Sequence, residues 1–156
     1  GDRLGFPVFP LEWVDPTTNE KSSGYREKGY FPEAFLNMLA FLGWNPGDER
    51  ELFSLEELVE AFSIERVGKA GAKFDADKTK WFNQQYLRMK SDEELADLLM
   101  PKLIEAGITA EQSFVTQVCG LMKERAGFVE DMMTDKFYFE APTEYDEKTI
   151  QNVIRH

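Results

Sequence analysis

Basic side chains gather in one stretch of this acidic chain, between Arg66 and Lys90. Seven lysines and arginines fall there against two aspartates, which gives the stretch a net charge of +5. The whole chain carries −11, so the rest of the sequence carries −16. A positive patch on a negative protein attracts a polyanion at one place and repels it elsewhere. The charge pattern therefore favours nucleic-acid binding through a confined surface over general, sequence-blind binding.

The segment from Asp77 to Lys90 is expected to form a helix that carries the clearest part of this pattern. One of its faces is polar and aromatic at helical spacing, and is formed by Lys78, Trp81, Gln85 and Arg88. The neighbouring face is apolar and is expected to lie in the core. Two interpretations of the polar face stay open. Either it lies on a nucleic-acid backbone with Trp81 stacked on a base, or it is the hydrated face of an ordinary amphipathic helix with Trp81 in the core.

The loop before this helix adds further cations. The candidate phosphate contacts, taken together, are Arg66, Lys69, Lys73, Lys78, Lys80 and Arg88. Each cation that neutralises a phosphate releases counterions, so several of them close together bind a polyanion far better than one. Their grouping makes phosphate binding about as well supported as a set of independently hydrated lysines, and both interpretations stay open.

Residues that other chemistries need are scarce. His156 is the one histidine and Cys119 the one cysteine, which leaves no metal site, no histidine-based catalysis and no internal disulfide. The acidic clusters fall in first helical turns or on hydrated faces, where they favour the helix dipole, so we assign no catalytic residue. No apolar run reaches the roughly 18 residues of a membrane span. A single cysteine suits a reducing compartment, and we expect the chain in the cytoplasm.

The expected elements around these residues are mostly helices. Helices are expected to begin at Pro32, Ser54 and Ser91, the last two with a capping box, and near Thr109, where Thr109 and Gln112 would cap the helix. Shorter helices are expected at 128–134 and from 143 onward. An extended piece at 8–14 is expected to pair with a strand at 64–67. The sequence thus predicts a mainly α fold with a small β element, divided near Lys90 into a mixed region (1–90) and an acidic helical region (91–156).

Two of these helices have apolar faces that we expect to be buried. In the helix that begins at Ser54, the buried face is expected to comprise Leu55, Leu58, Val59 and Phe62. In the helix near Thr109, it is expected to comprise Phe114, Val118, Leu121 and Met122.

Three stretches carry a more specific signal. They are GYFPEAFLNMLAFLGW at 29–44, ELFSLEEL at 51–58, and FSIERV followed by KFD and by the spaced Lys78, Trp81, Asn83, Tyr86 and Arg88. These motifs resemble the tRNA stem-contact region of bacterial glutamyl-tRNA synthetases, which are class I enzymes, and the resemblance runs from residue 1 to about 140. It implies that residues 1–90 contact the inner tRNA stem and that residues 91–156 belong to the first, helical anticodon-binding subdomain.

The same resemblance points to Arg125 as an anticodon contact. In such synthetases an arginine near the end of a helix in that subdomain helps to read the last anticodon base, and it favours the glutamate anticodon over the glutamine one. A guanidinium suits this task because its planar fork can donate two hydrogen bonds to a base edge. The alternative is a surface arginine that pairs with Glu124 or Glu130.

The resemblance also implies what this chain does not contain. Neither the family's lysine-x-serine-lysine loop nor its HxGH-like motif occurs in the sequence. We therefore expect the carboxy-terminal part of a glutamate–tRNA ligase without its catalytic domain. The parent enzyme would use ATP and Mg²⁺ to attach glutamate to tRNA(Glu), whereas this part would need no cofactor and have no activity of its own. The expected partner is tRNA(Glu), and the expected state is a monomer away from membranes.

Two alternatives remain. An acidic helical protein-interaction module would explain the negative charge, but it leaves the basic stretch without a role. A glutamine-specific synthetase is less favoured, because the carboxy-terminal region of that relative is built from β-barrels and this sequence is helical.

Overall fold

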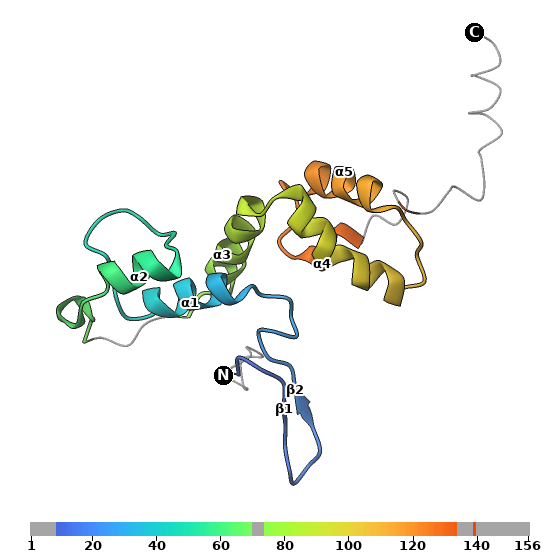
Figure 1. Ribbon diagram of the computed structural model, residues 1–156. Helices are drawn as coiled ribbons and strands as arrows, with labels where there is room; N and C mark the ends of the chain where they lie inside the picture. Colours follow the sequence, from blue (N-terminus) through green and yellow to red (C-terminus); the bar gives the residue numbers. More distant parts are fainter. Residues whose placement is uncertain (1–8, 70–73, 134–138, 140–156) are drawn as a thin grey trace, which may run out of the picture.

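The structure is a computed structural model that describes residues 9–69, 74–133 and 139. Its elements, in chain order, are β1 (Trp13–Val14), β2 (Lys21–Ser22), α1 (Pro32–Phe41), α2 (Leu55–Ala61), the 3-10 turn η2 (Ile64–Arg66), α3 (Ala76–Met89), α4 (Asp92–Glu105), α5 (Gln112–Met122) and the 3-10 turn η3 (Val129–Met133). The prediction of a mainly α fold with a small β element is confirmed. In Figure 1, α3 lies between α1 and α2 on one side and α4 and α5 on the other, and the hairpin projects away from the helices.

The β element is a short antiparallel hairpin. Trp13 lies opposite Ser22, and the loop between the strands closes on Asp15 Oδ1, which accepts hydrogen bonds from the amides of Thr17 (2.7 Å) and Thr18 (3.1 Å). The strand predicted at 64–67 was wrong, because Ile64–Arg66 forms a single 3-10 turn. A partner a few residues away closes a small loop, whereas a partner fifty residues away must close a large one, so the local pairing is favoured entropically.

Local capping signals position the helix starts. At α2, the amide of Glu57 donates to Ser54 Oγ (3.2 Å) and the amide of Ser54 donates to Glu57 Oε2 (2.8 Å). Ser91 and Glu94 repeat this capping box at α4, as predicted. The predicted cap of α5 was wrong: the helix begins at Gln112 after Glu111, whose side chain makes no capping hydrogen bond.

The largest buried cluster joins α1, α3, α4, α5 and η3. Phe31 and Ala34 come from the start of α1, and Tyr86 and Leu87 come from the end of α3. The rest come from the helical region after residue 90: Leu95, Ala96, Leu99, Leu103, Ile108, Val115, Val118, Cys119, Met122, Ala126, Val129 and Met132. This core crosses the boundary expected near Lys90, so the last turns of α3 belong to the same packing unit as α4 and α5.

Two apolar faces differ from the expectation. In α2 only Leu58 is buried, while Leu55, Val59 and Phe62 are exposed, because this short helix packs by one edge against α1 and the segment around Trp44. In α5 the buried positions include Val118 and Met122 as predicted, with Val115 and Cys119. Phe114 and Leu121 lie outside this stripe and are exposed, because the face that meets α4 and η3 is narrower than the run of apolar residues.

A buried asparagine ties the first part of the chain together. The Asn37 side chain, fully buried in α1, donates to the Glu51 carbonyl (2.9 Å) and accepts from the amide of Phe53 (2.9 Å) and from Tyr86 Oη (2.8 Å). It thereby fixes the segment before α2 to both α1 and α3.

Within the described ranges, none of the helices combines the length and apolar character needed to cross a membrane. The helix expected from residue 143 onward lies outside the described residues.

Candidate nucleic-acid interface

The predicted phosphate contacts lie on and before α3, and the structure separates them into two groups. Arg66, Lys78 and Arg88 bind other parts of the protein. Lys69 and Lys80 are exposed and form no ion pair within the described residues. Lys73 lies outside the described residues. The cations were predicted as one phosphate-binding set, but at least three of them also have structural contacts.

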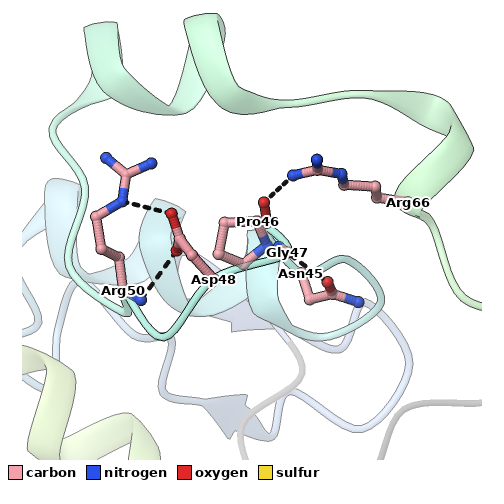
Figure 2. Close-up of polar contacts among 6 residues, drawn as sticks. All are labelled: Asn45, Pro46, Gly47, Asp48, Arg50 and Arg66. Carbon is pink, nitrogen blue, oxygen red and sulfur yellow. Dashed lines mark hydrogen bonds and ion pairs between the residues drawn. The ribbon is translucent and has the colours of Figure 1, made fainter.

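Arg66 connects η2 to the loop after α1. Its guanidinium donates to the Pro46 carbonyl, while Arg50 in the same loop pairs with Asp48 at 2.9 Å (Figure 2). Gly47 makes room for this contact, because a side chain there would overlap the Arg66 guanidinium. Its φ of 81° is also a backbone conformation that glycine adopts more readily than other residues. A carbonyl does not neutralise a cation, so Arg66 keeps its full charge at the surface.

Lys78 is shared between a carboxylate and an aromatic ring. Its Nζ pairs with Glu51 Oε1 and lies 4.1 Å from the centre of the Trp81 ring. About two fifths of each side chain in the ion pair is exposed, so the pair is weak and a phosphate can compete for the lysine. Trp81 is half-buried, with the Lys78 ammonium over its face and the Phe82 ring against it at 5.2 Å. It is therefore neither a core residue nor an unobstructed stacking platform.

An open hollow of about 370 Å³ lies beside α3 on the side of Lys80 and Trp81. Asp77 and Gln84 line it from the same helix, and Gly127, Phe128 and Asp131 line it from the segment after α5. Lys80 is the one cation among these lining residues, and two carboxylates accompany it. Two aromatic side chains, an amide and carboxylates suit a nucleoside better than a phosphate group, whereas the exposed Lys80 can contact a backbone phosphate.

Arg125 lies in the turn that leads from α5 to this hollow. Its side chain is exposed, and within the described residues no ion pair holds it. The alternative of a pair with Glu124 or Glu130 is not what the structure contains. Glu124 instead binds Arg88, and Glu130 binds Lys102 at 2.8 Å. The guanidinium is thus available to a ligand.

Sequence reasoning missed the role of Asn83, which is fully buried in α3. Its Oδ1 accepts from the amide of Phe31 (2.8 Å), and its Nδ2 donates to the Gly127 carbonyl (2.7 Å). The available signal was an amide between Phe82 and Tyr86 on the apolar side of the helix, where a polar group must find partners. Asn83 therefore links α3 to the turn that carries Arg125.

No group of three or more histidine, cysteine or acidic side chains in the described part of the chain is arranged to hold a metal ion.

Comparison with known proteins adds a family. Residues 15–81 match the family model for the catalytic domain of class I tRNA synthetases for E and Q. The match ends at Trp81 within α3, so much of the region expected to follow the catalytic domain is included in that model.

Among curated relatives, the chain is 63% identical over 150 residues to the glutamate–tRNA ligase of Phocaeicola vulgatus and 55% identical over 152 residues to that of Bacteroides fragilis. Two solved structures are also similar. A glutamate–tRNA ligase from Elizabethkingia meningosepticum, in complex with its amino acid, has a TM-score of 0.87 at 48% identity. The glutamate–tRNA synthetase from Elizabethkingia anophelis has a TM-score of 0.86 at 48% identity.

These matches cover nearly all of this chain but only part of each relative. The shared region is 96–97% of this chain and 30% of the two curated relatives. It is 97% of this chain and 30–31% of the two solved chains. Identity of this level across almost the whole chain, together with the same fold, shows that the chain belongs to the class I glutamyl-tRNA synthetase family, and it spans about 30% of the length of these relatives.

Proposed function

We propose that this chain provides the tRNA-recognition surface of a glutamate–tRNA ligase. Lys69 and Lys80, with Arg66, Lys73 and Lys78, would contact the phosphate backbone of the inner tRNA stem, and Arg125 would read the last anticodon base. Attachment of glutamate with ATP and Mg²⁺ would depend on the rest of the ligase. We expect it to act as a monomer in the cytoplasm. The free, buried Cys119 suits a reducing compartment such as this.

One observation carries this proposal. Arg125 is an exposed arginine without an ion pair in the described residues, and its turn continues into the hollow beside Lys80 and Trp81. The Arg125 guanidinium can act as a base-edge donor, and two residues further along the chain Gly127 begins the lining of the hollow, where Trp81 and Lys80 offer a ring edge and a phosphate contact. An acidic protein-interaction module would not require this combination.

The phosphate contacts are tested by titrating tRNA(Glu) with the chain at several salt concentrations. Lys80→Ala should weaken binding equally for every tRNA sequence and lower the salt slope by about 0.7–0.9. Lys21→Ala is the matched control, because it removes the same charge from the hairpin, away from α3. An unchanged slope for Lys80→Ala, or an equal loss for the control, would contradict the proposed surface.

The anticodon contact is tested with tRNA(Glu) and the same transcript carrying a changed last anticodon base. Arg125→Ala should remove about 1–3 kcal/mol of discrimination between these two tRNAs. An equal loss of affinity for both would reassign Arg125 to phosphate binding or to packing.

A further inference from the structure

The residues on either side of Arg125 are tied to different helices. Lys123 pairs with Asp92 Oδ1 at 2.7 Å, at the start of α4, and this hydrogen bond raises the pKa of Lys123. Glu124 is held by Arg88 at the end of α3: Arg88 Nη2 donates to the Glu124 carbonyl (2.8 Å), and Arg88 Nε lies 3.3 Å from Glu124 Oε2. The backbone immediately before Arg125 is therefore fixed to two elements.

The backbone after Arg125 is fixed as well. Asn83 donates to the Gly127 carbonyl, and Asp131 Oδ2 accepts from the amides of Gly127 and Phe128, each at 2.9 Å. Within the turn from residue 123 to 127, the side chain of Arg125 is the charged group left outside these contacts in the described structure.

Arg88 is poorly placed to contact a phosphate. Its Nε is buried from solvent, and its side chain as a whole is 35% exposed. Nη2 hydrogen-bonds the Glu124 carbonyl, while Nε faces the Glu124 carboxylate at 3.3 Å as an ion pair without a hydrogen bond, so the guanidinium is engaged with one residue of the turn. Its remaining N–H groups could still donate, but a phosphate would have to compete with the Glu124 carboxylate, which already faces the guanidinium.

We propose that Arg88 is a positioning residue: it holds the turn so that Arg125 presents its guanidinium to the anticodon. The proposal rests on the proposed anticodon role of Arg125. Base discrimination needs the donor fork held close to its productive geometry, and a turn already ordered before binding loses less conformational entropy when tRNA arrives. Arg88 thus contributes to which base is accepted without touching the tRNA.

Two substitutions separate this role from phosphate binding. Arg88→Lys keeps the positive charge but loses the fork. Glu124→Gln leaves Arg88 in place and removes the carboxylate, and Glu124 is exposed enough for the fold to tolerate the change. Glu130→Gln is the matched control, because it changes the charge equally and breaks the separate ion pair with Lys102.

The experiment measures dissociation constants of each variant for tRNA(Glu) and for the transcript with the changed last anticodon base, over a salt series. We expect Arg88→Lys and Glu124→Gln to lose about 5-fold or more of the discrimination, since one arginine–base contact provides roughly 5- to 150-fold. Their salt slopes should remain those of the wild type, because no phosphate contact is lost. The control should discriminate as the wild type does.

Wild-type discrimination in both variants would overturn the positioning role, as would Arg88→Ala lowering the salt slope by about 0.7–0.9 with discrimination intact. Amide hydrogen exchange of residues 123–127 supplies a second readout that does not involve tRNA. Faster exchange in both variants supports the positioning role, and unchanged exchange refutes it. A wild-type chain that does not discriminate at all, but whose turn loosens in the variants, would refute the anticodon role of Arg125 instead.

Discussion

Replacement of Asn83 by alanine should destabilise the fold strongly, because this buried side chain satisfies two backbone groups from distant parts of the chain. The change leaves the amide of Phe31 and the carbonyl of Gly127 without their partners at 2.8 and 2.7 Å. Both groups lie next to the buried cluster in which side chains of α1, α3 and the segment after α5 pack together. The loss therefore affects the fold and the turn of Arg125 together.

The magnitude follows from the burial of the two orphaned groups. A buried polar group without a hydrogen bond costs about 1–3 kcal/mol, so two of them cost roughly 2–6 kcal/mol. Gly127 is only half-buried, and water can replace part of its lost contact, which places the expected loss near 3 kcal/mol. That is a large share of the roughly 5–15 kcal/mol that stabilises a typical domain. It corresponds to a fall in Tm of about 6–12 °C for a domain of this size.

The assay is urea unfolding followed by circular dichroism, with the free energy of unfolding taken by linear extrapolation. Asn45→Ala is the control, because Asn45 is exposed and its side chain accepts one hydrogen bond, from the amide of Gly47 (3.1 Å). It should lose less than about 1 kcal/mol. An Asn83→Ala variant within 1 kcal/mol of the wild type would refute the assignment of Asn83 as the link between these segments.

Asn83→Asp adds a pH signature to the same site. The substitution keeps an oxygen for the Phe31 amide but places another oxygen against the Gly127 carbonyl, where Asn83 Nδ2 now donates. Burial and repulsion should raise the pKa of the new carboxyl group above its ordinary value of about 3.9. The stability deficit is then largest at neutral pH and shrinks as pH falls through that raised pKa, because the protonated acid can donate to Gly127. The deficit of Asn83→Ala should not change in this way.

Gly24→Ala should destabilise the base of the hairpin by about 1–3 kcal/mol, because an added Cβ would overlap the backbone of Leu11. Gly43→Ala is the control in the same unfolding assay, because a Cβ at Gly43 meets nothing within 4 Å. Cys119 should react with a thiol-alkylating reagent at pH 8 at least about 100-fold more slowly in the folded than in the urea-unfolded chain, because burial, aided by the charge of Asp92, raises its pKa from 9.0 to about 11. Because the Cys119 pKa is higher in the folded chain, the free energy of unfolding should fall as pH rises from the unfolded-state pKa of 9.0 toward 11. Rapid labelling of the folded chain would contradict the burial of this thiol.

The local signals in the sequence predicted the helices well. Ser54 with Glu57 and Ser91 with Glu94 each form the expected capping box, since such a motif depends on side chains three residues apart and on nothing further away. The apolar faces were less predictable. Val59 and Leu121 fit helical periodicity but are exposed, because periodicity shows which residues share a face and not how much of that face a neighbouring helix covers.

The candidate site shows the same division. From the sequence alone, the composition and spacing indicated an acidic, mainly helical chain with one basic stretch, and the resemblance to glutamyl-tRNA synthetases pointed to Arg125. Only the tertiary structure decided which cations remain free for a ligand. Arg88 pairs with the carboxylate of Glu124, 36 residues away along the chain, and Lys78 pairs with that of Glu51, 27 residues away. Charge pairing depends on distances of a few ångströms through space, and packing brings such partners together without leaving a periodic pattern along the chain.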